Sequence, residues 1–593
     1  MKLHAALAAA LCAALLASPP VAPAKAPKAP APQPTATGSG GAVTTVDPYA
    51  TEAGMDVLRR GGNAVDAAVA AASVLGVVEP YSAGIGGGGF MVVHWAGTGR
   101  TTTIDGRETA PASFPADAFI DPQTGEPYPS SMFRELATSG LAVGVPGTVR
   151  TWELALRRYG TRKLRRLLRP SIRLAHRGFV VDETLSAQTE ANLDRFNDFT
   201  STRATYTRDG AAPAPGSVLR SRDMARTLRA ITKRGSRALH RGPIARDIVR
   251  TVRRPPLVAG STRNARPGHM TMADLRGYRA KWRAPTRSHY RGLEILGMGP
   301  PSSGGSTVGE ALNILEGFDG FGDDRTLSLH RYLEASKLAF ADRGAFLGDP
   351  DFVDVPLARL LSDDFACQRR RLIGETALEA PVAAGDPQSG CGAGSTARAS
   401  DAQEGPSTTH LTVTDRWGNV VSYTLTIEQT GGSGIVVPGR GFLLNNELTD
   451  FDFAPGRANS PAGGKRPRSS MAPTIVLRDG RPWLALGSPG GSTIITTVLQ
   501  VLVNRLDLGM TLPQAISAPR ASQRNTARVT AEPEFIASPE GQALAGDPYR
   551  HAFTDGGEIG AATGIEFLGG GRVLAAAEPA RRGGGSAAAE RRR

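Results

Sequence analysis

The chain of 593 residues contains only three cysteines, which is too few for a disulfide framework. Cys12 lies in an apolar N-terminal run, so only Cys367 and Cys391 are left, and these two could pair in an oxidising compartment. Neither the cysteines nor the nine histidines are spaced as metal ligands. We therefore expect no metal site and no cofactor.

Aromatic residues are also few, at 6% of the chain, and they do not alternate with basic residues as a nucleic-acid stacking platform requires. The net charge is +14, and its densest part, residues 157–169, lies where a helix is expected to turn a polar face to solvent. We interpret this charge as a solvated basic surface that could assist adhesion to anionic surfaces, and we expect no nucleic-acid partner.

No stretch after the N-terminus is long and apolar enough to predict a membrane span. At the N-terminus a short basic start precedes an apolar run over residues 5–17, and Ala22–Ala24 offers a cleavage site. This pattern predicts a signal peptide over residues 1–24 and a protein that is secreted or held in the cell envelope or periplasm; a disordered alanine-rich leader is the alternative. Residues 25–44 and the tail from about residue 581 are rich in small residues and are predicted to be disordered.

The first part of the chain has mainly helical patterns. Apolar residues from Met55 to Leu75 recur at helical spacing, and Gly61–Asn63 divides them into two predicted helices. A further helix is predicted over residues 148–159 with Gly160 as its C-cap, and another over residues 327–346.

The pattern changes after an aperiodic segment, residues 379–407, which predicts an exposed loop. Alternating side chains predict a strand from Thr409 and a second strand that ends near Leu425, and Asp479-Gly480 predicts another hairpin. An apolar helix follows over residues 494–508. Helices first, then strands, then a helix predict an α+β protein with sheets packed between helical layers.

The glycine run Gly84–Gly89 matches the dinucleotide-binding fingerprint but lies in the wrong context. A helix precedes these glycines and the strand 90–95 follows them, whereas the fingerprint needs a strand before it and a helix after it. We therefore reject a cofactor site and expect close backbone packing beside a buried site.

Thr408 opens the first strand after the loop, a position that suits an N-terminal nucleophile. Cleavage of the bond between Ser407 and Thr408 would give Thr408 a free α-amine with an ordinary pKa of about 7.7–8. That amine can act as the base for the hydroxyl of the same residue. The hydroxyl could also attack the Ser407 carbonyl beforehand and cut the chain itself. An ordinary threonine at a strand start is the alternative.

The loop Gly487–Ser492 joins a strand to a helix that begins at Thr493. Unpaired N–H groups point outward at a helix N-terminus, and Gly490 and Gly491 let a substrate oxygen approach them. This arrangement predicts an oxyanion hole for acyl transfer. A plain connection with Ser492 as the N-cap residue is the alternative.

Four stretches occur in order along the chain: Gly61–Asp66 with the glycine run, Asp105–Glu108, Thr408–His410, and Leu444–Phe451 continuing through Arg466–Met471 to Pro489–Ser492. Together they resemble the γ-glutamyltranspeptidase family over roughly residues 45–530. The resemblance implies a four-layer αββα N-terminal nucleophile hydrolase fold. It also implies self-cleavage into a large subunit, residues 45–407, and a small subunit, residues 408–593, which stay together as a heterodimer.

The resemblance further implies roles for individual residues. Thr408 would form the γ-glutamyl ester with support from Thr426, and Gly490 and Gly491 would hold the oxyanion. The other residues would bind the donor's amino-acid head: Arg107, Ser469 and Ser470 its α-carboxylate, and Glu447 and Asp450 its α-ammonium. A head with both charges suits a guanidinium on one side and carboxylates on the other. An ion-pair network without function is the alternative.

The chain departs from the family pattern at two places. Glu428 stands where the family commonly has an asparagine, so it could strengthen cation binding or indicate a different donor. The interval from Asp450 to Ser469 is short and lacks Tyr and Trp, as in members without a lid. The implied activity is transfer of γ-glutamyl groups from glutathione-like amides to water, amino acids or peptides. The alternatives are an acylase for other amides, such as cephalosporin side chains or poly-γ-glutamate, and an inactive surface-binding relative.

Overall fold

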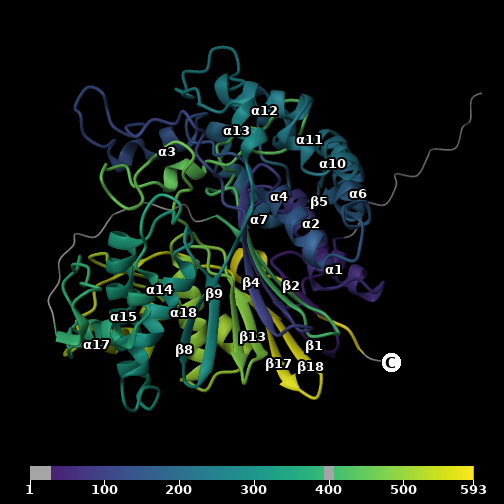
Figure 1. Cartoon of the computed structure of the whole chain (residues 1–593). Coiled ribbons are helices and arrows are strands. Elements are labelled where there is room, and N and C mark those ends of the chain that lie inside the picture. The colour runs from purple at the N-terminus through teal and green to yellow at the C-terminus, as the bar shows by residue number, and fades with distance from the viewer. Residues whose placement is uncertain (1–28, 393–406, 592–593) are drawn as a thin grey trace, which may run out of the picture.

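Two seven-stranded sheets form the centre of the molecule (Figure 1). The computed structural model describes residues 29–392 and 407–591. The first sheet has the order β1 (Thr35–Ser39), β18 (Arg572–Ala577), β17 (Thr563–Gly569), β13 (Arg481–Gly487), β12 (Thr474–Arg478), β9 (Leu293–Met298), β8 (Pro285–Tyr290). The second has the order β19 (Ser586–Ala589), β2 (Ala42–Thr45), β10 (Thr409–Thr414), β11 (Val420–Thr426), β3 (Gly88–Trp95), β4 (Arg100–Asp105), β7 (Lys281–Arg283). Neighbouring strands are antiparallel throughout both sheets.

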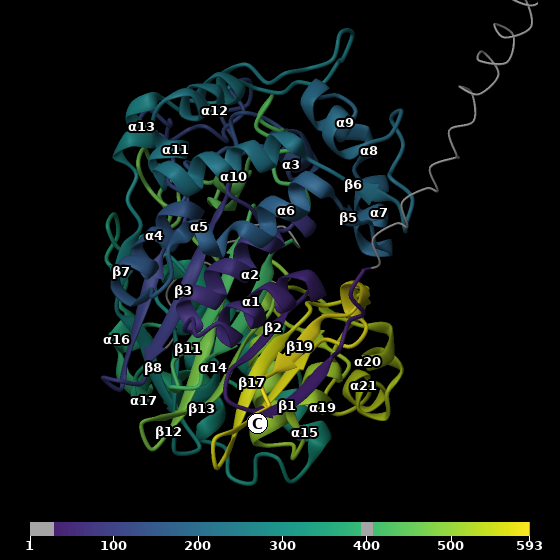
Figure 2. The same cartoon turned by 90° about the vertical axis from the view of Figure 1, so that its right-hand side faces the viewer.

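Helices cover the outer face of each sheet, so the layers follow the order αββα (Figures 1 and 2). The second sheet packs against α1 (Pro48–Arg59), α2 (Ala64–Val78), α4 (Thr148–Tyr159), α6 (Arg169–Arg177) and α10 (Arg222–Arg234). The first packs against α14 (Gly304–Glu316), α15 (Arg325–Phe346), α18 (Thr493–Leu506) and α19 (Leu512–Ser517). The other α-helices of the described residues are α3 (Phe133–Ala137), α5 (Leu164–Leu167), α7 (Glu183–Glu190), α8 (Leu193–Phe196), α9 (Thr200–Tyr206), α11 (Arg237–His240), α12 (Pro243–Arg253), α13 (Met272–Gly277), α16 (Leu357–Leu360), α17 (Asp363–Arg370), α20 (Pro533–Ala537) and α21 (Pro539–Ala545).

Local sequence signals set several element ends as predicted. Asn63 and Asp66 form a capping box at the start of α2, so α1 and α2 divide at the glycine pair before Asn63. Gly160 is the C-cap of α4, whose bounds agree with the predicted helix. The hairpin β12–β13 turns at Asp479-Gly480, where both residues have positive φ.

Two predictions of disorder are wrong. Part of the segment 25–44 forms β1 and β2, and part of the tail after residue 581 forms β19. Strand β19 pairs with β2 and strand β1 pairs with β18, so β1 and β19, from the beginning and the end of the described residues, lie side by side (Figure 2). Small side chains such as Ala42, Ala577 and Ala587 fill a shared buried cluster, and these long-range pairings give order that composition alone does not indicate.

Cys367 and Cys391 form a disulfide, which settles the pairing that the sequence left open. The predicted signal peptide, and residues 393–406 of the predicted loop, lie outside the described residues. In the part of the chain that the structure describes, none of the helices combines the length and apolar character that crossing a bilayer requires. Within the same residues, no group of three or more His, Cys, Asp and Glu side chains is arranged to hold a metal ion.

His410 lies buried between the two sheets, where its ring packs beside Gly487. Its Nδ1 is 2.8 Å from Thr424 Oγ1, and its Nε2 is 3.1 Å from Thr412 Oγ1. Burial lowers the pKa of His410 to about 3. The ring therefore stays neutral in the folded chain at a pH where the unfolded chain binds a proton.

We expect His410 to lower the stability of the fold as the pH falls from its ordinary pKa of 6.5 towards 3. Only the unfolded chain takes up the proton in this range, which costs about 1.4 kcal/mol of the free energy of unfolding per pH unit. Denaturant unfolding at pH 7 and at pH 5 checks this. Between pH 7 and pH 5, the free energy of unfolding of a His410→Gln variant should fall by about 2 kcal/mol less than that of wild type. Equal losses in both proteins would contradict it.

Candidate active site

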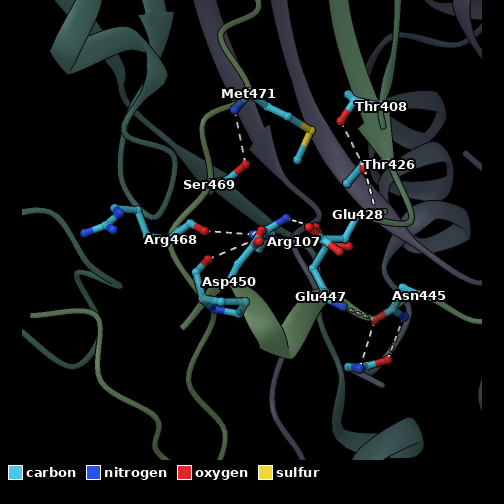
Figure 3. A network of polar contacts seen from close by, with 12 residues as sticks. Arg107, Thr408, Thr426, Glu428, Asn445, Glu447, Asp450, Arg468, Ser469 and Met471 are labelled. Atoms are coloured by element: carbon cyan, nitrogen blue, oxygen red, sulfur yellow. Dashed lines mark hydrogen bonds and ion pairs between the residues drawn. The ribbon is translucent and has the colours of Figure 1, made fainter. Parts of the chain in front are cut away.

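Thr408 immediately precedes β10, and the pairing of β10 with β11 brings Thr426 beside it (Figure 3). Thr408 Oγ1 is within hydrogen-bond reach of the carbonyl oxygen of Ser407 and lies 3.2 Å from Thr426 Oγ1, and its single proton can be donated to either. Thr426 Oγ1 in turn accepts a hydrogen bond from the Glu428 N–H over 2.8 Å. The hydroxyl of Thr408 is thus buried against the carbonyl group of the bond that would be cut.

Arg107 lies at the centre of a buried ion-pair cluster (Figure 3). Its guanidinium binds Glu447 and, over 2.5 Å, Asp450 Oδ2. It also donates to the carbonyl oxygens of Arg468 at 2.8 Å and Pro467 at 3.1 Å. Burial alone would lower the pKa of Arg107, but Glu447 and Asp450 outweigh burial and raise it. The guanidinium therefore carries a permanent charge in a site that is closed to most solvent.

Asn445 holds the turn that carries the two carboxylates, η3 (Glu447–Asp450). Its side-chain oxygen accepts hydrogen bonds from the N–H groups of Gly144 and Glu447, at 2.9 and 3.1 Å. Its amide nitrogen donates to the carbonyl oxygens of Gly86 and Gly144, at 2.7 and 2.9 Å. The glycine run that we expected beside a buried site is thus tied through Asn445 to the carboxylate turn.

Glu108 is a site neighbour for which the sequence predicted no role of its own. It is buried, and neither of its carboxylate oxygens has a hydrogen-bond partner among the described residues. Burial, followed by the charge of Glu447, raises the pKa of Glu108 well above its ordinary value. This favours the neutral acid at Glu108, which lies beside the ion pairs of Arg107 with Glu447 and Asp450.

The loop before α18 has the backbone geometry of an anion site. Gly490 and Gly491 have φ values of 137° and 58°, which favour glycine over other residues. Within the described residues, neither of their N–H groups donates a hydrogen bond, so both are available to a developing oxyanion. Ser492 does not cap α18 with its side chain, and its hydroxyl instead accepts a hydrogen bond from Arg524 over 2.6 Å.

One cavity brings together most of the predicted site residues. It is lined by Arg107, Ser407, Thr408, Thr426, Glu428, Glu447, Asp450, Ser469, Ser470 and Gly491, together with Met471 and Ile494. Gly490 instead lines a neighbouring cavity of about 240 Å³ that also borders Ser407. Ser470 Oγ accepts a hydrogen bond from Arg343 over 2.8 Å, a partner that no local motif indicated.

Two stacked sheets between helical layers, with a threonine at the start of a central strand, define an N-terminal nucleophile hydrolase. A cephalosporin acylase from Bacillus halodurans has a similar structure, with a TM-score of 0.82, 31% sequence identity, and 97% of this chain and 99% of that chain covered.

Residues 50–588 match the gamma-glutamyltranspeptidase family. A glutathione hydrolase proenzyme from Bacillus subtilis (strain 168) is 42% identical over 489 residues, which cover 82% of this chain and 80% of that protein. An acylase ACY 1 proenzyme from Pseudomonas sp. (strain V22) is 40% identical over 491 residues, which cover 82% of this chain and 83% of that protein. The chain belongs to the γ-glutamyltranspeptidase family and is an enzyme.

Proposed function

We propose that the chain cuts itself between Ser407 and Thr408, and that the resulting heterodimer transfers γ-glutamyl groups from glutathione-like amides to water, amino acids or peptides. The observation that carries this proposal is the single cavity that joins the Thr408 hydroxyl to the charge cluster around Arg107. The Thr408 hydroxyl provides a nucleophile, and the charge cluster provides a binding site for the amino-acid head of a donor.

Self-cleavage uses groups that are already in contact. Thr408 Oγ1 attacks the Ser407 carbonyl carbon, the bond to the Thr408 nitrogen breaks, and that nitrogen takes the hydroxyl proton. Water then hydrolyses the ester between Ser407 and Thr408 Oγ1. The products are a carboxylate on Ser407 and a free α-amine on Thr408, which acts as the base in each later turnover.

Donor cleavage follows the same chemistry. The α-amine accepts the proton of the Thr408 hydroxyl, and the oxygen attacks the γ-carbonyl of the donor. The oxyanion receives hydrogen bonds from the N–H groups of Gly490 and Gly491. The amide bond breaks, the leaving amine takes the proton, and a γ-glutamyl ester remains on Thr408. Water or an acceptor amine then attacks this ester and releases the γ-glutamyl group.

The donor head would exchange partners with the ion-pair cluster. Without a donor, Arg107 binds Glu447 and Asp450 directly. A zwitterionic head offers Arg107 a carboxylate and offers the two acids an ammonium group, so each buried charge keeps an opposite charge as a partner.

A panel of three anilides tests the donor class. γ-Glutamyl anilide carries both head charges, glutaryl anilide lacks the α-ammonium, and 4-aminobutyryl anilide lacks the α-carboxylate. We expect kcat/KM for the γ-glutamyl donor to exceed each of the others by about a hundredfold, because each missing charge leaves buried partners unpaired. Equal or better turnover of glutaryl anilide would favour the acylase alternative.

Glu428 is expected to strengthen binding of the α-ammonium. It is buried in the same cavity and accepts a hydrogen bond from Asn446. Its φ of 78° is a left-handed conformation that asparagine tolerates well, so Glu428→Asn fits the backbone while removing the charge. We predict that this variant raises KM for γ-glutamyl anilide about tenfold and leaves KM for glutaryl anilide unchanged. An equal change for both donors would contradict the assignment.

An acylase for larger amides is the second candidate, because the interval between Asp450 and Ser469 is short and lacks Tyr and Trp. The donor panel extended with a cephalosporin side-chain amide and poly-γ-glutamate decides between the two.

We also propose that the protein is exported. The N-terminal pattern supports this, and the disulfide Cys367–Cys391 suits an oxidising compartment. Fractionation of cells and sequencing of the mature N-terminus test the proposal, and an intact N-terminus in the cytoplasm would contradict it.

A further inference from the structure

The C-terminal segment reaches the nucleophile through Arg582. The Nη1 of Arg582 donates a hydrogen bond to the carbonyl oxygen of Thr408 over 2.7 Å. Its Nη2 donates to Ser82 Oγ over 2.5 Å and lies 3.4 Å from Glu79 Oε2. The Arg582 side chain is only 16% exposed. A largely buried guanidinium therefore joins the nucleophile residue to the end of α2.

The backbone around Arg582 is built to hold this contact. Arg582 has a φ of 56°, which is uncommon for a non-glycine residue, and Gly583 follows with a φ of 79°. The Arg582 N–H donates to Glu558 Oε2 over 2.8 Å. The preceding Arg581 is anchored by ion pairs with Glu532 and Glu578. These contacts keep Arg582 in the conformation that points its guanidinium at Thr408.

We infer that Arg582 is a positioning residue for Thr408. Arg582 anchors the carbonyl group of Thr408 and favours the neutral form of the Thr408 α-amine. The inference rests on the proposed function. After cleavage Thr408 is the first residue of the small subunit and has lost its covalent link to Ser407. A hydrogen bond from a charged donor to its carbonyl oxygen then restrains the residue that must present both hydroxyl and amine.

The charge of Arg582 acts against protonation of the amine. The acids that face this region are Glu79 at the end of α2, Asp182 before α7, Glu558, and three acids of the cavity that Thr408 lines, Glu428, Glu447 and Asp450, the last two of which pair with Arg107. The acids favour the protonated amine when they are ionised, whereas Arg107 and Arg582 disfavour it. Burial raises the pKa of Glu79, and the charge of Arg582 opposes that rise. Removal of Arg582 should therefore raise the pKa of the amine. On the acidic side of the pH profile kcat rises as the amine loses its proton, and this rise, the acid limb, should move to higher pH.

The test compares Arg582→Gln and Arg582→Lys with a matched control, Arg591→Gln, which removes an exposed charge from the same segment. Each processed enzyme is assayed with γ-glutamyl anilide across pH, after N-terminal sequencing of the small subunit and a thermal unfolding scan. We expect Arg582→Gln to lower kcat about tenfold, with KM nearly unchanged, and to move the acid limb up by about one unit. Arg582→Lys keeps the positive charge and should therefore keep the wild-type acid limb. It should lower kcat about threefold, because an ammonium group lacks the planar, two-pronged donor arrangement of a guanidinium.

Two results would overturn the inference. One is an Arg582→Gln enzyme with the kcat and acid limb of the Arg591→Gln control. The other, which decides the matter where Arg582→Gln does not fold, is an Arg582→Lys enzyme whose acid limb moves or whose kcat equals wild type. Failure of the proposed function is distinguishable, because wild type itself would then show no small subunit beginning at Thr408 and no turnover.

Discussion

Replacement of Thr408 by alanine will leave the chain uncut and lower kcat for γ-glutamyl hydrolysis by at least about 10⁴-fold. The hydroxyl that lies against the Ser407 carbonyl is the group that attacks it, and the same hydroxyl forms the ester in turnover. Without it neither the cleavage nor the later chemistry has a nucleophile. Intact mass and N-terminal sequencing measure the cleavage, and γ-glutamyl anilide hydrolysis measures turnover.

A matched control separates loss of the nucleophile from damage to the strand. Thr409 is the next residue, it is buried in β10, and its hydroxyl has no hydrogen-bond partner among the described residues. Thr409→Val keeps the shape and should cleave and turn over nearly as wild type does. Thr408→Ser keeps a hydroxyl and should retain both reactions. Release of the fragment 408–593 by the Thr408→Ala variant would show that another group cuts the chain.

Local features of the fold were predictable because their causes are local. Asn63 and Asp66 cap α2 with their own side chains, and Gly160 ends α4 through its own backbone. The position of Thr408 at a strand start was also readable, since alternation of side chains begins at the next residue. These signals need no knowledge of what packs against them.

Features that depend on distant partners were not predictable in the same way. Strands β1 and β19 have small residues and gain their order from pairing with β18 and β2, far along the chain. The contact between Arg582 and Thr408 has the same cause, because it joins two segments that meet only in the folded molecule. The raised pKa of Glu108 follows from its burial beside Glu447, and sequence spacing does not reveal that burial. The charge cluster itself was anticipated only through the family resemblance.

Removal of the Arg107 charge is expected to affect stability and donor binding together. An Arg107→Gln variant leaves Glu447 and Asp450 buried without their cation, which should destabilise the fold by about 3–5 kcal/mol. It also removes the proposed partner of the donor α-carboxylate, so KM for γ-glutamyl anilide should rise by about a hundredfold or more. Thermal unfolding and steady-state kinetics measure the two effects.

A second substitution separates the two effects. In Arg107→Gln/Asp450→Asn, one positive and one negative buried charge are removed together, so much of the lost stability should return. Donor binding should not return, because no cation faces the α-carboxylate. Recovery of KM along with stability would mean that Arg107 acts only by holding the turn that carries Glu447 and Asp450.

The donor offers an independent check on the same contact. 4-Aminobutyryl anilide lacks the α-carboxylate, so wild type should discriminate against it, whereas Arg107→Gln has already lost the group that makes this distinction. The ratio of kcat/KM between the γ-glutamyl and 4-aminobutyryl donors should therefore fall from about a hundredfold to nearly one in the variant. A general distortion of the cavity would weaken both donors and leave the ratio unchanged. The ratio thus reports the contact between Arg107 and the α-carboxylate separately from the contribution of Arg107 to folding.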